Sequence, residues 1–255
     1  TKLGDSVKEM NIDKDVPLFW YQLFVGLGVL MFSHLAWGSP TGLNNIPTTD
    51  IVSKDVLVLQ SWLNMAANEH TQQFIGFKYG ALKDVEVGVD WKANDRTHGH
   101  AMFQAKYAFD IRGDAWRGVI GVAGLSDNRE HNGDYFPYAA TSLNLEVFRL
   151  HFGFAPEPHN ERFFGGIDKT VTFLDRNLQL RADAIHINDK EDTLFSVGFL
   201  YELGAKAGAD RGPKNGPAGL LSTLMQNMIL ESWVSMPSTG DKETYTIKLN
   251  YVIPF

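Results

Sequence analysis

The sequence predicts an all-β fold: an antiparallel meander of about 11–12 strands, closed into a transmembrane β-barrel and preceded by one N-terminal hydrophobic helix. Three observations predict it. Apolar and polar residues alternate in runs of eight to eleven residues from residue 56 onward, which is typical of strands with two chemically different faces. Helical periodicity is absent after residue 50, and connectors as short as Lys83-Asp84 predict tight hairpins. A chain of 255 residues, 44% of them hydrophobic, suffices for one large β domain.

The N-terminal part contains a run of twenty residues without formal charge, Leu18 to Trp37. A helix of this length spans roughly 30 Å, the apolar thickness of a bilayer. Two interpretations compete: an export signal cleaved before Ser39, or an uncleaved signal-anchor helix. A buried helix is a third. We therefore expect a signal or membrane-anchor segment at 1–38, a linker rich in Gly, Pro, Asn and Thr at 39–50, and a β-barrel domain at 51–255.

The strands are read from the period-two runs and from the turn residues between them. We expect eleven strands at 56–66, 73–82, 85–92, 100–111, 115–125, 137–145, 148–154, 177–187, 194–203, 226–236 and 244–255, and a twelfth at 162–172. Three longer loops are predicted at Ser126–Pro137, Ala155–Gly166 and Gly204–Ser222. The last is rich in Gly, Ala, Pro and Lys, and we expect it on the surface.

The alternation alone does not say which face meets which solvent. In a soluble β-sandwich the apolar face would form the core, whereas in a transmembrane barrel it meets lipid and the polar face lines the lumen. Strands of about ten residues match a tilted membrane crossing, and aromatic residues gather toward the strand ends, as in an interfacial girdle. These features favour the barrel. Val87, Phe103, Phe152 and Leu249 are then expected to face lipid.

The last strand carries apolar residues at every second position and ends on an aromatic residue, in the series Ile247, Leu249, Tyr251, Ile253 and Phe255. In this the sequence resembles bacterial outer-membrane β-barrel proteins, whose final strand has this pattern. The resemblance implies a location in the bacterial cell envelope, in the outer membrane.

A second, weaker resemblance lies in Gly42–Trp62, where Gly42-Leu43 and Pro47-Thr48 precede the first strand, and in Phe163–Thr170. Here the chain resembles the YjbH-like outer-membrane proteins associated with exopolysaccharide production. This resemblance implies a connection with glycan export and names no catalytic residue.

Composition and motifs exclude several classes of chemistry. The chain has no Cys, which excludes a thiol nucleophile and cysteine-ligated metals. A net charge of -7 argues against nucleic-acid binding. No Gly-x-Ser-x-Gly, Walker or His-Glu-x-x-His motif occurs. His98 and His100 share a strand face, but spacing suggests no third metal ligand. We expect no enzyme, no cofactor and no metal site, with an outer-membrane hydrolase as the open alternative.

The polar face carries both signs of charge. The candidate lumen-lining residues are Lys78, Glu86, Asp90, Lys106, Asp110, Arg149, His151, Arg181, Asp183, Glu202, Glu231 and Lys248. Because buried charges need partners or water, this near balance predicts either a salt-bridged, nearly closed lumen or a narrow wet channel.

Two functions from different classes remain. The first is a non-enzymatic outer-membrane barrel for the passage of small or glycan-like solutes, or with an accessory role in export. The alternative is an accessory subunit of a larger membrane complex, anchored in the inner membrane by the N-terminal helix and carrying a periplasmic β domain. The expected partners are membrane lipid and, through the basic Lys206, Arg211 and Lys214, a glycan or lipopolysaccharide.

Overall fold

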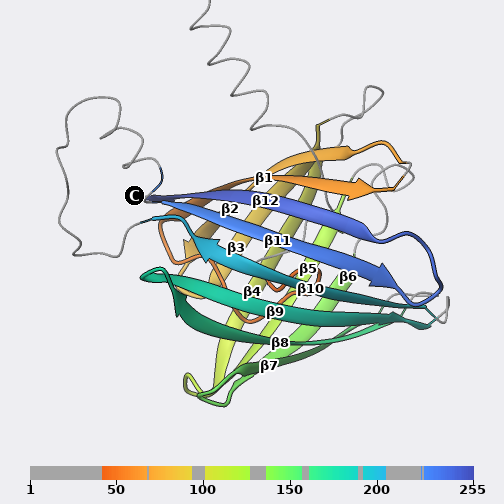
Figure 1. Ribbon diagram of the computed structural model, residues 1–255. Helices are drawn as coiled ribbons and strands as arrows, with labels where there is room; N and C mark the ends of the chain where they lie inside the picture. The colour runs from red at the N-terminus through yellow and green to blue at the C-terminus, as the bar shows by residue number, and fades with distance from the viewer. Residues whose placement is uncertain are drawn as a thin grey trace, which may run out of the picture.

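In the computed structural model, the described residues are 42–67, 69–93, 101–126, 136–156, 161–188, 192–204, 225 and 227–255. They form twelve antiparallel strands in one closed barrel, in which each strand pairs with its neighbours along the chain and the first pairs with the last (Figure 1). The strands are β1 (Val56–Ala66), β2 (Gln72–Leu82), β3 (Val85–Lys92), β4 (Ala101–Arg112), β5 (Trp116–Leu125), β6 (Phe136–Asn144), β7 (Arg149–Ala155), β8 (Arg162–Phe173), β9 (Arg176–Ile187), β10 (Asp192–Glu202), β11 (Met228–Pro237) and β12 (Thr244–Pro254).

The predicted closed antiparallel barrel is confirmed, and so is the twelfth strand, β8. The predicted loop Ala155–Gly166 was wrong at its second half, because β8 begins at Arg162 and residues 162–166 pair with both β7 and β9. Gly166 lies within this strand and leaves room for the side chains of Leu43 and Ile46. The region of the predicted loop Gly204–Ser222 lies outside the described residues, Gly204 excepted.

Closure depends on the pairing of β1 with β12. The two strands run in unbroken register from Val56 opposite Pro254 to Ala66 opposite Thr244. Closing the sheet leaves no strand edge with unpaired N–H and C=O groups, which is the condition for a sheet to cross a bilayer.

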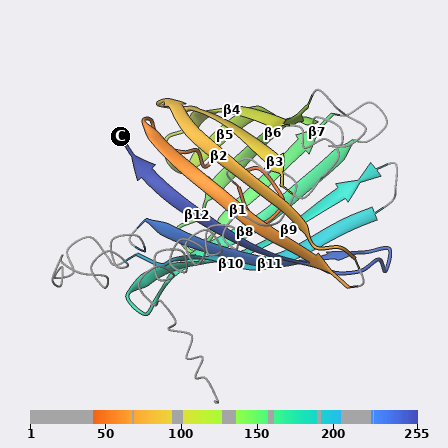
Figure 2. The same ribbon diagram turned by 90° about the horizontal axis from the view of Figure 1, so that it is seen from above.

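The two ends of the barrel differ (Figures 1 and 2). One end, called here the turn end, carries the start of β1, the end of β12 and the short connections 83–84, 113–115, 145–148 and 174–175. In the last of these, Leu174 and Asp175 have φ of 48° and 58°, as a two-residue hairpin turn that follows the twist of its strands requires. The connection between β10 and β11 also begins and ends at the turn end. The opposite end is called the loop end.

The outer face is apolar and the inner face is polar. Phe103 and Phe152 are 56% and 54% exposed, and Val87 and Leu249 are partly exposed on the same outward side. Charged residues such as Lys78, Glu86 and Asp90 are instead buried, each at 1% exposure. A soluble sandwich would show the reverse, so the distribution is that of a barrel whose outer face contacts lipid.

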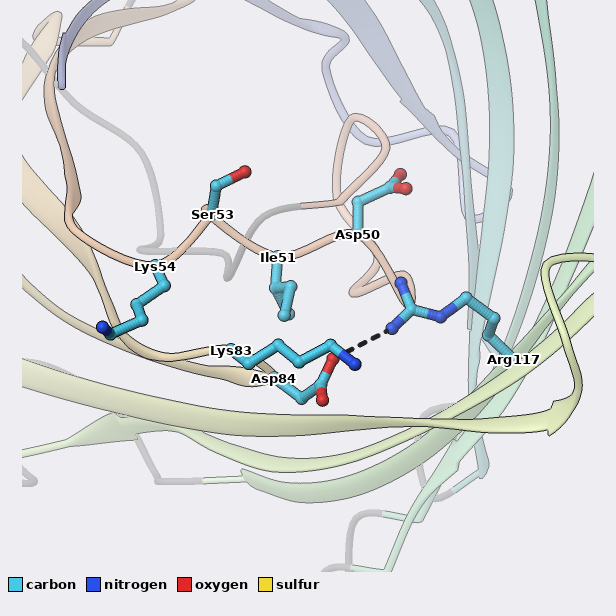
Figure 3. A pocket seen from close by; sticks show the side chains of 7 residues that line it. All are labelled: Asp50, Ile51, Ser53, Lys54, Lys83, Asp84 and Arg117. Atoms are coloured by element: carbon cyan, nitrogen blue, oxygen red, sulfur yellow. Dashed lines mark hydrogen bonds and ion pairs between the residues drawn. The ribbon is translucent and has the colours of Figure 1, made fainter.

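The segment Gly42–Ser53 runs inside the barrel, and we call it the plug segment (Figure 3). The sequence predicted a linker over most of it. The structure shows instead that Leu43, Ile46 and Thr48 are buried at 3% exposure or less. The segment has no strand pattern because its backbone N–H groups bond to side chains of the barrel wall and not to a neighbouring strand. From its sequence it therefore resembles a connector.

The predicted signal or anchor segment lies outside the described residues. Among the described residues, no helix combines the length and apolarity needed to cross a bilayer.

Candidate functional site: the plugged interior of the barrel

The apolar side of the plug segment packs against the inner wall formed by β4–β8. Leu43 and Ile46 are its buried apolar side chains. Gly166 on β8 makes room for both, since a Cβ atom at this position would lie 2.5 Å from Leu43 Cδ1 and 2.9 Å from Ile46 Cδ1. The wall side chains of this cluster are mostly small: Ala108, Val119, Ala123, Tyr138, Ala140, Ala155 and Phe164.

The tip of the plug segment is bound by the adjoining strands β9–β11, next to β8. The backbone N–H groups of Asn44 and Asn45 donate to Asp183 Oδ2 on β9, at 3.0 and 3.3 Å. The Asn45 amide also donates to the hydroxyls of Ser196 on β10 and Ser235 on β11, at 2.5 and 2.8 Å. The tip therefore touches three adjacent strands, which continue the sheet from β8.

A second group of contacts holds Thr49. Its N–H donates to Ser142 Oγ on β6 at 3.3 Å. Ser142 Oγ lies 2.7 Å from His151 Nδ1 on β7, and His151 Nε2 lies 2.8 Å from Asp168 Oδ2 on β8. Arg149 on β7 donates to the same Asp168 oxygen at 2.8 Å.

Arg149 also closes this network on the plug segment. Its Nη1 and Nη2 donate to the two carboxylate oxygens of Asp50 at 2.7 and 3.0 Å, which is the bidentate geometry of a strong charge-assisted pair. We call the group formed by Ser142, Arg149, His151 and Asp168, together with Thr49 and Asp50, the plug clasp. Ser142 and Arg149 connect it to the adjacent plug residues Thr49 and Asp50.

The charge state of Asp50 follows from these contacts. Burial would raise the pKa of Asp50, but the hydrogen bonds and positive charge of Arg149, assisted by Lys106, outweigh it and hold that pKa well below its usual range. Lys106 on β4 also donates to the backbone carbonyls of Thr48, at 3.3 Å, and Asp50. The carboxylate is thus ionised when it binds Arg149.

A different network, which we call the Glu231 cluster, fills the interior beside β1, β9, β11 and β12. Glu231 accepts hydrogen bonds from Arg181 Nη1 at 2.6 Å and from Asn250 Nδ2 at 2.7 Å, and Lys248 Nζ lies 3.5 Å from it. Gln60 donates to Asn250 at 2.7 Å. Buried charges are tolerated when they are paired and hydrogen-bonded in this way.

The structure separates the twelve predicted lumen residues into two groups. Nine are buried on the inner face: Lys78, Glu86, Asp90, Lys106, His151, Arg181, Asp183, Glu231 and Lys248. Arg149 is partly exposed, with 27% of its side chain accessible. Asp110 and Glu202 lie near the turn end, where Asp110 pairs with Arg117 and Glu202 accepts from Asn177. That these residues contact a solute during its passage through the barrel stays a prediction.

Sequence reasoning missed several interior residues. Ser142, Asp168, Ser196 and Ser235 face inward and hold either the plug segment or the clasp. The alternation along each strand predicts that these side chains point inward. It does not predict which residue a serine or an aspartate on the polar face will contact. The plug residues Asn45 and Asp50 had no strand pattern at all.

The arrangement of Ser142, His151 and Asp168 has the distances of a nucleophile, a base and an orienting carboxylate. Here the serine oxygen accepts from the N–H of Thr49, and Ser142 is only 6% exposed. The group therefore connects the plug to the wall in this structure. Among the described residues, no cluster of three or more metal-ligating side chains occurs.

A pocket of about 400 Å³ opens beside the plug at the turn end (Figure 3). Asp50, Ile51, Ser53, Lys54, Lys83, Asp84 and Arg117 line it. Arg117 Nη2 lies 3.5 Å from Asp84 Oδ1, as the dashed line in Figure 3 marks. Asp50 therefore belongs both to the clasp and to the lining of this pocket, and its carboxylate points away from Lys83, Asp84 and Arg117 (Figure 3).

Comparisons with known proteins define the class of fold. No protein-family profile matches the chain, and no curated protein matches its sequence. Among solved structures, the KdgM porin, solved in complex with disordered oligogalacturonate, aligns with a TM-score of 0.55 and 14% identity, over 76% of this chain and 98% of that one. A porin from Rh. blastica aligns at 0.38 and 7%, over 71% and 55%, and OpdL from Pseudomonas aeruginosa at 0.30 and 9%, over 78% and 98%. The chain has the fold of a transmembrane β-barrel of the bacterial outer-membrane type.

Proposed function

We propose that this chain is a non-enzymatic barrel of the bacterial outer membrane that passes small polar or glycan-like solutes, and that the plug segment closes the passage in the structure described here. One observation carries the proposal: the interior of a closed, lipid-facing barrel is polar, and a segment that belongs to no strand fills it. A barrel that only anchored a complex would have no need of a separate interior segment.

The orientation follows from the connections. In outer-membrane barrels the short turns face the periplasm and the longer loops face outward. Four of the five connections at the turn end have only two to four residues, the β10–β11 connection being the exception, so we place the turn end, with the pocket at Lys54 and Lys83, in the periplasm. The apolar outer face also disfavours the alternative of a periplasmic β domain.

The test compares three forms of the chain in planar bilayers and in liposomes. The unaltered chain should conduct little, because the plug segment is seated. A form lacking residues 42–52 should conduct steadily and admit small sugars. A folded, plug-deleted barrel that admits neither ions nor sugars would refute the proposal.

The third form is a locked control. Because the chain has no cysteine, the pair Leu43→Cys and Gly166→Cys can form only one intramolecular disulfide. A Cβ at Gly166 would contact the side chain of Leu43, with Cδ1 2.5 Å away, so the two positions are neighbours, as a disulfide requires. The oxidised form should stay closed under conditions that open the unaltered chain.

A further inference from the structure

The carboxylate of Asp50 occupies a place that a carboxylate of another molecule could take. Both of its oxygens are bound by the guanidinium of Arg149, and its backbone carbonyl is bound by Lys106. This fork-to-carboxylate geometry recognises planar carboxylates in general. The ligand here happens to be part of the chain.

We propose that Arg149 forms a carboxylate-binding site of the passage, that Asp50 fills this site in the closed state, and that a solute carrying carboxylates competes with Asp50 and so favours release of the plug segment. The proposal rests on the proposed function and deepens it by naming the class of solute: acidic sugars or other small organic acids.

The site keeps its shape without Asp50 because the barrel wall holds Arg149. The Nε of Arg149 donates to both oxygens of Asp168 at 3.2 Å, and its Nη2 donates to Asp168 Oδ2 at 2.8 Å. The remaining edge of the guanidinium is the edge that binds Asp50. A donor pair held in place by a second carboxylate loses little freedom on binding a new ligand.

The site can also be reached from solvent. The side chain of Asp50 is 41% exposed, and Asp50 is among the residues that line the pocket at the turn end. By contrast, Thr49 and Val52 of the plug segment are buried. Arg149 is itself 27% exposed, so of these plug contacts the Arg149–Asp50 pair is the one that a solute carboxylate can reach.

Competition at this point has a defined structural consequence. A ligand shifts a conformational equilibrium only by binding one state better than the other. A solute carboxylate can bind Arg149 only after Asp50 has left it, so it stabilises states in which Thr48–Val52 are displaced. Neutral sugars of the same size lack this differential contact.

The experiment measures plug release directly. In a chain without cysteine, Thr49→Cys places one thiol on a residue that is 2% exposed. Its rate of reaction with a maleimide reports displacement of the plug segment. Glucuronate and glucose are matched probes, because they differ by a carboxylate in place of a hydroxymethyl group. We expect glucuronate to raise the labelling rate several-fold, and glucose, or sodium chloride at the same ionic strength, to leave it unchanged.

Variants assign the effect to the proposed site. Arg149→Gln in the Thr49→Cys background should label faster without any solute and should no longer respond to glucuronate. Lys83→Gln, which alters the pocket but not the guanidinium, should keep a response. Equal acceleration by glucuronate, glucose and chloride, or a glucuronate response that survives Arg149→Gln, would overturn the inference.

The failure of this inference is distinguishable from failure of the proposed function. If the form lacking residues 42–52 conducts but glucuronate does not affect labelling, the passage exists and the carboxylate site does not. If that form does not conduct, the passage itself is refuted.

Discussion

The plug clasp and the Glu231 cluster are both buried networks of charge inside one barrel, yet they are built differently. Every member of the Glu231 cluster lies on a strand, so Gln60, Arg181, Glu231, Lys248 and Asn250 are brought together by the same pairing that closes the sheet. The clasp instead ends on Thr49 and Asp50, which belong to no strand. The Glu231 cluster therefore stays together as long as the barrel is folded, whereas the plug clasp can lose its contacts with Thr49 and Asp50 in a folded barrel. The difference distinguishes charges that stabilise the wall from charges that hold a removable part.

The largest effect is expected from removal of Glu231, which tests whether its cluster stabilises the wall and does not close the passage. Glu231→Ala leaves Arg181 and Lys248 without their shared carboxylate, and breaking a buried pair in this way costs about 3–5 kcal/mol. We expect the free energy of unfolding in detergent to fall by that order while conductance stays low. A stable Glu231→Ala barrel with high conductance would show that this cluster, too, closes the passage.

Gly166→Val tests the apolar packing of the plug segment, in which Leu43 and Ile46 lie against Gly166. A side chain here would occupy the space of Leu43 and Ile46, and expelling one such side chain forfeits about 1.5–3 kcal/mol of burial. Conductance should rise strongly while the melting temperature of the barrel changes little.

The neighbouring glycine supplies the control for this change. At Gly165 the nearest atom to an added Cβ is His151 O at 3.4 Å, an ordinary contact. Gly165→Val should leave conductance unchanged. Equal effects at both positions would mean that strand strain, and not displacement of the plug segment, is measured.

Ser142→Ala removes the hydroxyl between Thr49 and His151. A hydrogen bond of this kind contributes about 1 kcal/mol, so labelling at Thr49→Cys should accelerate by about fivefold. Thr141→Ala is the matched control, because Thr141 bonds Trp116 and the carbonyl of Arg117, away from the plug segment. Acceleration in both variants would argue against a specific contact.

The smallest effect is expected from acid. Because the folded-state pKa of Asp50 is lowered, the Arg149–Asp50 contact contributes stability above the ordinary Asp pKa of about 3.9 and loses it only as pH falls through the lower folded value. Labelling at Thr49→Cys should therefore change little between pH 7 and pH 5 once corrected for the intrinsic reactivity of the thiol.

Asp50→Asn shows how much of the plug attachment depends on this carboxylate. It should raise the labelling rate at neutral pH, because the amide cannot replace a charged acceptor at the guanidinium. Unchanged labelling in Asp50→Asn would show that the packing of Leu43 and Ile46 against the wall is sufficient to retain the plug segment.

The sequence by itself determined the strands and their faces. Side chains of a strand point alternately to opposite sides, so Phe103 and Phe152 on one side and Lys106 and His151 on the other could be assigned before any pairing was known. The alternation is a local property, and the predicted bounds of β2 and β4 differ from the observed ones by only one residue.

Only the tertiary structure decided what the polar face touches. Ser142, His151 and Asp168 come from three strands, and Asn45 meets serines from two more. Such partners depend on barrel closure and register, which bring together residues far apart in the chain. The plug segment shows the same limit: its backbone groups are satisfied by the wall and not by neighbours in sequence. From its residues alone it therefore resembles a connector, and only the enclosing barrel makes it a plug.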